Sequence, residues 1–104
     1  MNIDSIDTKK LEKTAFILKT IAHPVRLKII EVLKDKSMSV NELCEFLQIE
    51  QSLTSHHLAT MRKKGVLETA REGKKVFYAL KMTEVLEVLK CMYSCCATTS
   101  KGFS

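Results

Sequence analysis

The sequence predicts a mostly α-helical domain that carries one β-hairpin in its last third. Apolar residues recur at helical spacing along most of the chain, which indicates amphipathic helices. Between residues 66 and 80 this spacing gives way to alternation on both sides of a Glu-Gly pair, which indicates two short strands. A length of 104 residues is typical of one domain, so we expect residues 1–104 to fold as a single unit.

Two helices are predicted at the start of the chain. Residues 8–21 place apolar side chains at helical spacing. His23 ends this pattern because the residue before a proline disfavours the helical region. Pro24 is well placed in the first turn of a helix, and the second helix is therefore predicted over residues 24–34.

A second pair of helices follows a turn at residues 35–39. Ser39 and Glu42 have the spacing of a capping box, so the third helix is predicted over residues 39–47. After a short turn, residues 50–64 form the fourth helix. The apolar and packing side chains that mark its inner side are Leu53, His57, Leu58 and Met61.

The rest of the chain changes character twice. Gly65 suits the left-handed position that ends a helix. Residues 66–80 then alternate as two strands joined by a charged tip, which predicts a β-hairpin. Helical spacing returns over residues 83–96, and residues 97–104 are expected to be a frayed tail.

The composition is that of an ordinary cytoplasmic protein with a polyanionic partner. Hydrophobic residues make up 45% and charged residues 28%, and no apolar run is long enough to span a membrane. The first ten residues contain two acids and no apolar segment, so no signal peptide is expected. The four cysteines are therefore expected to be thiols. A net charge of +5 favours a nucleic acid as partner.

Two short helices joined by a tight turn, residues 39–47 and 50–64, are the pattern of a helix-turn-helix. Short polar side chains open the second helix, and they can reach base edges in the major groove. Basic side chains at its far end and on the hairpin suit phosphates. This order predicts a winged helix-turn-helix that binds double-stranded DNA. The predicted DNA-binding residues are Gln51, Ser52, Ser55, His56, Arg62, Lys63, Arg71, Lys74 and Lys75.

Other functions fit less well. A solvated polar face explains any one of these residues alone, and an interaction module without operator specificity would share the charge. An enzyme is not expected, because a reactive cysteine favours a helix N-terminus, whereas three of the four cysteines end a helix. His56 and His57 point about 100° apart on a helix. We assign His56 to DNA and His57 to packing or to a hydrogen bond that buttresses the helix.

Several segments resemble the ArsR/SmtB family of bacterial winged-helix repressors. They are "IAHPVRLKIIEVL", "QSLTSHHL", "MRKKGVL" and "REGKKVFYAL", and the resemblance covers roughly residues 11–96. It implies a homodimer built mainly from the first and last helices. It also implies an operator with two half-sites, about 10 bp apart or a multiple of that, and release of DNA when an inducer binds or thiols are modified.

The sensing sites of other members are not reproduced here. The Cys-Val-Cys segment of some members corresponds to residues 39–41, Ser-Val-Asn, and lacks both thiols. Cys44 lies nearby on the apolar face and is expected to be a buried small hydrophobe. Members that sense persulfides have a thiol on the second helix where this chain has Glu31. The positions of zinc ligands on the last helix are here Met82, Glu84, Cys95 and Thr98.

Cys91, Cys95 and Cys96 lie within six residues at the end of the last predicted helix. This end resembles some arsenic-responsive members, and soft thiolates suit As(III) or Sb(III). Cys91 and Cys95 are one turn apart on a helix, whereas Cys96 lies about 100° from Cys95, on the apolar stripe that holds Leu89. The hypothesis is that capture of a metalloid by all three distorts this helix and releases DNA. The alternative is a redox or persulfide response of the same thiols, and DNA binding itself is expected to need no cofactor.

Overall fold

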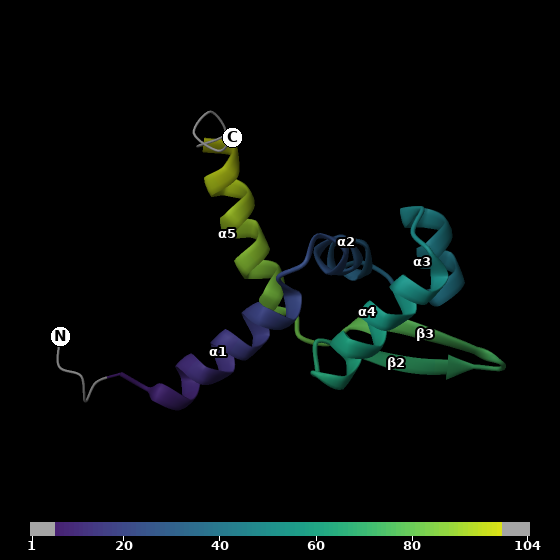
Figure 1. Cartoon of the computed structure of the whole chain (residues 1–104), viewed down its shortest axis with the longest axis horizontal. Helices are drawn as coiled ribbons and strands as arrows, with labels where there is room; N and C mark the ends of the chain where they lie inside the picture. The colour runs from purple at the N-terminus through teal and green to yellow at the C-terminus, as the bar shows by residue number, and fades with distance from the viewer. Residues whose placement is uncertain (1–5, 99–104) are drawn as a thin grey trace.

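The computed structural model describes residues 6–98, and this part of the chain contains five helices and a three-stranded sheet (Figure 1). The predicted fold class, mostly α with a β-hairpin wing, is confirmed. The first helix has the predicted bounds, and the others differ from the prediction by at most two residues at either end. The elements are α1 (Thr8–Ile21), α2 (Pro24–Leu33), β1 (Met38–Ser39), α3 (Val40–Leu47), α4 (Gln51–Lys63), β2 (Leu67–Glu72), β3 (Lys75–Leu80) and α5 (Glu84–Thr98).

Side-chain caps explain where α2 and α3 begin. The His23 ring accepts a hydrogen bond from the backbone N–H of Val25 at 3.1 Å, which makes this histidine the N-cap of α2. The predicted capping box of α3 is present. Ser39 Oγ accepts from the N–H of Glu42 at 3.3 Å, and Glu42 Oε1 accepts from the N–H of Ser39 at 2.9 Å. Together these bonds satisfy donors that the first turn of a helix leaves without partners.

The end of α4 fixes the direction in which the chain enters the wing. Gly65 has a φ of +88°, a conformation that glycine adopts without strain. Its N–H donates to the carbonyl of Arg62 at 3.0 Å, and the N–H of Val66 donates to the carbonyl of Met61 at 2.9 Å. This pair of bonds is a Schellman motif, and the buried side chains of Val66 and Met61 complete it.

The wing is an antiparallel hairpin of β2 and β3. Its register runs from Leu67 opposite Leu80 at the base to Glu72 opposite Lys75 at the tip. Gly73, with a φ of +63°, makes the turn between the two strands. The tip therefore extends beyond the helical body with charged residues around it (Figure 1).

A third strand, β1, was not expected from the sequence. Met38 pairs with Tyr78 and Ser39 pairs with Phe77, so the sheet order is β1-β3-β2. The prediction of a turn across residues 35–39 is therefore wrong for its last two residues. A strand of two residues has no periodicity of its own, and it forms here because β3 offers an edge to pair with.

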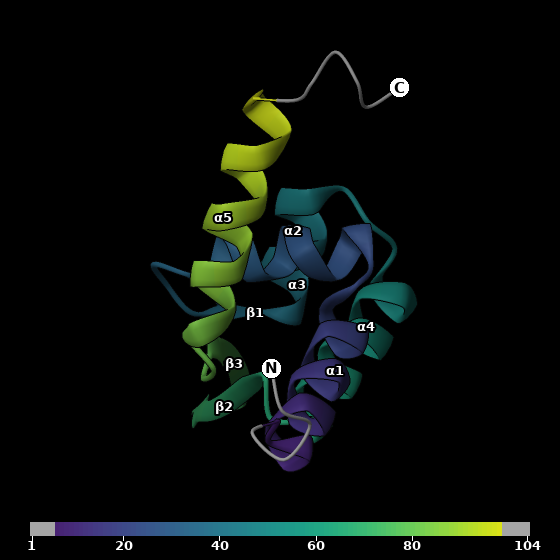
Figure 2. The same cartoon turned by 90° about the vertical axis from the view of Figure 1, so that its left-hand side faces the viewer.

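The core lies where α2, α3, α4 and the base of the wing meet. α1 and α5 lie at the end of the molecule away from the wing tip (Figure 1), and Figure 2 shows α5 rising past α2. α5 continues to Thr98, so the predicted tail is wrong for residues 97 and 98, and the remainder of that tail lies outside the described residues. No helix in the described part is both long and apolar enough to cross a bilayer. The apolar side chains with no exposed surface are Ile29, Ile30, Leu43, Leu58, Met61 and Val66.

Candidate nucleic-acid interface

α4 has one buried face and one polar face. The buried side chains are Thr54, His57, Leu58 and Met61. The prediction that Leu53 lies on the inner side is wrong, because its side chain is 43% exposed. Thr54 packs inward instead, and its hydroxyl donates to the carbonyl of Glu50 at 2.9 Å. An internal hydrogen bond lets this threonine occupy a core position that the apolar pattern did not predict.

The opposite face of α4 carries the predicted reading residues. Gln51, Ser52 and His56 are exposed and Ser55 is half-buried. Glu50, the N-cap residue of α4, was not among the predicted residues. Its carboxylate accepts a hydrogen bond from the Ser52 hydroxyl. A carboxylate at this position opposes phosphate and can accept a hydrogen bond from the amino group of cytosine. Glu50 therefore belongs with the polar face of α4.

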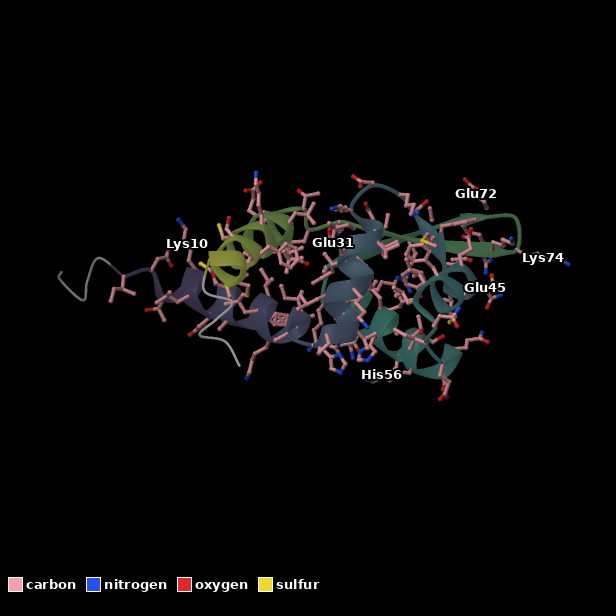
Figure 3. All side chains as sticks on the ribbon, turned by 90° about the horizontal axis from the view of Figure 1, so that it is seen from above. Lys10, Glu31, Glu45, His56, Glu72 and Lys74 are labelled. Carbon is pink, nitrogen blue, oxygen red and sulfur yellow. The ribbon has the colours of Figure 1, made fainter. Side chains whose placement is uncertain are left out.

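The wing brings its basic tip close to the start of α4. Lys74 lies at the outer end of the wing, and His56 lies at the edge of the helical body (Figure 3). A hollow of about 410 Å³ separates the wing tip from the starts of α3 and α4, and its lining includes Gln51, Lys74 and Lys75. Asn41 of α3 lines the same hollow, although the sequence analysis had not assigned it to DNA. Amide and ammonium groups thus converge on one concave surface, which Glu42 and Glu45 of α3 also line.

The other predicted basic residues lie further away. Arg62 and Lys63 are exposed at the end of α4, about three turns or 16 Å along the helix from Gln51. Arg71 is exposed on β2, next to the tip. The nine predicted residues therefore form a central group around the start of α4 and the wing tip, flanked by a second basic group at the far end of α4.

An arginine from α2 connects α2 to α4 by hydrogen bonds. Arg26 Nε donates to His57 Nδ1 at 2.9 Å, and Arg26 Nη1 donates to the carbonyl of Thr20 at 2.7 Å. Because Nδ1 accepts a hydrogen bond, the neutral ring carries its proton on Nε2. His57 Nε2 is buried without a hydrogen-bond partner among the described residues. The prediction that His57 buttresses the helix is confirmed.

The surroundings of His57 oppose its protonation. Burial lowers the pKa of His57, and the charges of His23, Arg26 and His56 lower this pKa further. The rings of His23 and His57 lie 4.4 Å apart between centroids. Protonation of His57 would also place a proton on Nδ1, which would remove the acceptor that Arg26 uses. The contact between α2 and α4 therefore requires the neutral form of the His57 ring.

Comparison with known proteins shows the family of this chain. The family model described as bacterial regulatory protein, arsR family, matches residues 23–69. The transcriptional activator HlyU of Vibrio cholerae is 37% identical over 93 residues, which cover 89% of this chain and 85% of HlyU. The chain belongs to the ArsR family. The transcriptional repressor PagR of Bacillus anthracis is also similar to this ArsR-family chain, with 39% identity over 88 residues that cover 84% of this chain and 88% of PagR.

Solved structures of ArsR-family relatives share the fold. The crystal structure of the repressor BigR from Xylella fastidiosa has a TM-score of 0.79 and 32% identity, and covers 91% of this chain and 96% of that one. A structure of reduced HlyU from Vibrio cholerae has a TM-score of 0.75 and 37% identity, and covers 84% and 92% of the two chains. These neighbours identify the fold as a winged helix-turn-helix. The ArsR-family chain is a DNA-binding transcriptional regulator and not an enzyme.

The cysteine-rich end of this ArsR-family regulator lies on α5, far from the wing tip (Figure 1). Cys91, Cys95 and Cys96 are exposed, and all four cysteines of the chain are thiols and not disulfides. Across residues 6–98, no three His, Cys, Asp or Glu side chains lie close enough together to hold a metal ion. This agrees with the geometry of a regular helix, in which Cys96 points about 100° away from Cys95.

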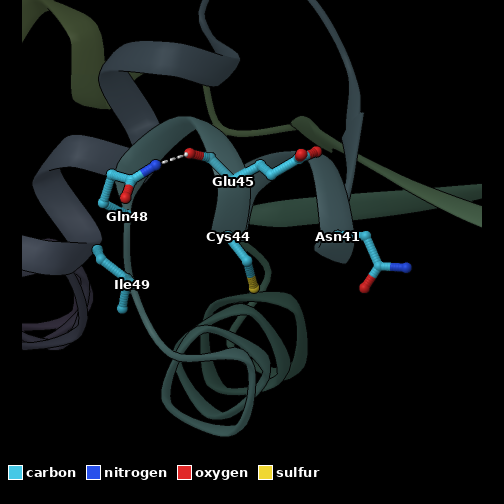
Figure 4. Close-up of a pocket in the computed structure, with 5 residues that line it drawn as sticks. All are labelled: Asn41, Cys44, Glu45, Gln48 and Ile49. Carbon is cyan, nitrogen blue, oxygen red and sulfur yellow. Dashed lines mark hydrogen bonds between the residues drawn. The ribbon is translucent and has the colours of Figure 1, made fainter.

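Cys44 was predicted to be a buried small hydrophobe, and the structure shows it half-buried. It lines an open hollow of about 480 Å³ together with Asn41, Glu45, Gln48 and Ile49 (Figure 4). Gln48 Nε2 donates to the carbonyl of Glu45 at 2.9 Å across this hollow. The sulfur of Cys44 points toward α4 (Figure 4).

Proposed function

We propose that the chain is an operator-binding repressor in which the first turns of α4 read the major groove and the wing contacts flanking phosphates. The observation that carries this proposal is the hollow that Gln51 shares with Lys74 and Lys75. Ser55 and His56 follow on the same polar face of α4. Short polar groups suit base edges, and lysines at a wing tip suit phosphates. One relative is a transcriptional activator and another is a transcriptional repressor, so the family alone does not give the direction of regulation. Repression is therefore part of the proposal.

Binding to promoter DNA of defined sequence tests this assignment. Ser55→Ala and His56→Ala should reduce the preference for operator over unrelated DNA. Lys74→Ala should weaken binding to all sequences. It should also reduce the slope of log K against log salt concentration by about 1, the loss of one phosphate contact. Lys10→Ala is the matched control, because this exposed lysine lies at the other end of the molecule (Figure 3). Equal losses on every sequence for Ser55, His56 and Lys74 variants would contradict the division into reading and phosphate contacts.

We propose that the active form is a homodimer that pairs through α1 and α5. Leu18 and Val88 are about 40% exposed or more, and both line a groove of about 160 Å³ between these helices. Exposed apolar side chains at this spacing favour an apolar partner surface. Val88→Asp should give a monomer in sedimentation at micromolar concentration. Phe46→Asp, at a 60% exposed residue of α3, should leave the dimer intact. A wild-type chain that sediments as a monomer would contradict this part.

We further propose that As(III) or Sb(III) is the inducer and that Cys91, Cys95 and Cys96 bind it. Cys91 and Cys95 are exposed one turn apart on the same side of α5. Each thiol that binds arsenous acid forms an As–S bond and breaks an As–O bond, and the thiol proton leaves with the displaced hydroxide as water. Binding of Cys96 as the third ligand requires the end of α5 to bend. Since α5 belongs to the proposed dimer, this bend would change the spacing of the two reading helices.

A thiol redox response is the second candidate, because the same three thiols are exposed. Formation of a disulfide removes two electrons and two protons. Peroxide takes them up as it is reduced to water, and an organic persulfide takes them up as it is reduced to a thiol and hydrogen sulfide. The C-terminal end of a helix carries partial negative charge and disfavours the reactive thiolate. This favours metalloid binding over oxidation at α5.

Native mass spectrometry separates the two candidates. The reduced protein is exposed in separate samples to arsenite, zinc, persulfide and peroxide. Arsenite should add one arsenic per chain and block Cys91, Cys95 and Cys96 against alkylation, while Cys44 stays reactive. Cys95→Ser should lose most of this binding, and Cys44→Ser, the matched control, should keep it. Loss of two mass units with peroxide or persulfide, without any arsenic adduct, would support the redox response instead.

A further inference from the structure

Tyr93 links the thiol-rich end of α5 to α2. Its hydroxyl donates to Glu31 Oε2 at 3.1 Å, and the other oxygen of the same carboxylate accepts from Lys34 Nζ. Tyr93 lies between Cys91 and Cys95 in the sequence. The carboxylate of Glu31 is thus one point at which the segment with the proposed inducer site contacts the helical body.

The Tyr93 side chain lies between two hollows. One, of about 270 Å³, is bordered by Leu27 and Val32 of α2 and by Leu47, the last residue of α3. The other, of about 230 Å³, is bordered by Lys34, the C-cap residue of α2, and by Leu89 of α5. Tyr93 therefore shares a hollow with the last residue of α3, the first helix of the helix-turn-helix. The side chain is 52% exposed, and its hydrogen bond to Glu31 ties it to α2.

The turn of α5 that Cys91 and Cys95 close contains Tyr93. At about 100° per residue, Tyr93 points about 160° away from each of these two thiols, on the side that faces α2. Cys96 lies between the two directions, about 60° from Tyr93. A centre that binds all three thiols must turn Cys96 toward Cys95 by about 100°. The backbone that carries Tyr93 belongs to the turn that this movement distorts.

We propose that the hydrogen bond between Tyr93 and Glu31 couples inducer binding at the three thiols to DNA binding by the helix-turn-helix. In the bare protein it holds α5 against α2, and it breaks when Cys96 joins Cys91 and Cys95. Tyr93 is a positioning residue, since it acts through Glu31 and touches neither inducer nor DNA. This inference rests on the proposed function of the three thiols.

The chain offers a direct optical reporter of this bond. It contains two tyrosines and no tryptophan, so Tyr78→Phe leaves Tyr93 as the only emitting residue. A carboxylate that accepts the phenol proton quenches tyrosine emission. Loss of the bond should therefore raise the emission.

The test uses the variant Cys44→Ser/Tyr78→Phe, in which the three thiols of α5 remain. One sample receives arsenite. Another receives 1,3,5-tris(bromomethyl)benzene, which forms three S–C bonds with loss of three bromides and so draws the three thiols together even if arsenite does not bind. Glu31→Ala in the same background removes the acceptor and gives the emission expected once the bond is lost, and it should show no further rise with either reagent.

A rise in Tyr93 emission to the Glu31→Ala level after three-point cross-linking supports the inference, whatever arsenite does. Emission that stays unchanged in the cross-linked protein overturns it. The inference is also overturned if the denatured chain forms three links but the folded protein does not. The end of α5 then cannot bend far enough for Cys96 to join the other two thiols. A cross-linked response without an arsenite response overturns only the metalloid proposal.

Operator binding gives a second readout. In wild type, occupation of the three thiols should weaken operator binding by a factor in the usual allosteric range, about 5-fold to 150-fold. Tyr93→Phe should bind arsenite or the cross-linker as wild type does, yet lose most of this factor. Tyr78→Phe, the matched control, should keep it. An unchanged factor in Tyr93→Phe would show that another contact carries the signal.

Discussion

Replacement of Arg26 by methionine tests the joint between α2 and the reading helix. Methionine keeps an unbranched apolar stem but removes both donors, the bond to His57 Nδ1 at 2.9 Å and the bond to the Thr20 carbonyl at 2.7 Å. His57 is only 3% exposed, so its Nδ1 atom is left buried without a partner. Such a loss costs about 1–3 kcal/mol, and the carbonyl of Thr20 adds about 1 kcal/mol. The expected loss in free energy of unfolding is about 2–4 kcal/mol.

Urea unfolding at a fixed protein concentration measures this loss, because the stability of a dimer depends on concentration. The midpoint should fall while the m-value stays constant. A double-mutant cycle with His57→Phe isolates the pair, since phenylalanine fills the ring site without offering an acceptor. We expect a coupling free energy of about 1.5 kcal/mol between Arg26 and His57. A loss below about 0.5 kcal/mol for Arg26→Met, or additive single variants, would refute the view that this bond holds α4.

Three further predictions follow from the described contacts. The lowered pKa of His57 means that the unfolded chain binds more protons than the folded chain in acid. The contribution of His57 to stability should therefore be complete above about pH 6.5 and be lost as the pH falls below it. Urea midpoints between pH 8 and 5 measure this change, and His57→Phe should make the midpoint less dependent on pH. Ser39→Ala should cost about 1 kcal/mol in thermal or urea unfolding, because it removes the hydroxyl that caps the N–H of Glu42. Glu50→Gln should tighten binding to DNA of any sequence in low salt, because it removes a negative charge next to Ser52; unchanged affinity would place Glu50 away from the phosphates.

Much of the fold was predictable because its signals are local. Pro24, the Ser39–Glu42 capping box and Gly65 each act within a few residues, and the structure has all three in the expected roles. β1 was missed because two residues carry no period, and only β3 gives them a partner. Leu53 was predicted to face inward, whereas Thr54 does. A hydrogen bond to a backbone carbonyl lets threonine be buried, and an apolar pattern cannot indicate this.

The candidate interface was predictable in its residue types but not in its grouping. The polar first turns of α4 and the basic wing could be read along the chain. The hollow that joins Gln51 to Lys74 depends on how the hairpin packs beside α3, and it also brings in Asn41. The contact between Glu31 and Tyr93 spans 62 positions and two helices, so no local pattern reports it. Long-range contacts of this kind are set by tertiary packing.

The central claim is that a thiol-binding inducer releases this regulator from DNA, and arsenite titration into the complex with promoter DNA tests it most directly. The reduced wild-type protein is held on labelled promoter DNA at fixed salt, and fluorescence anisotropy follows the complex as arsenite is added. The account predicts that the anisotropy falls to that of free DNA near one arsenite per chain, and that Cys95→Ser stays bound. A complex that persists in excess arsenite with all thiols reduced would contradict it.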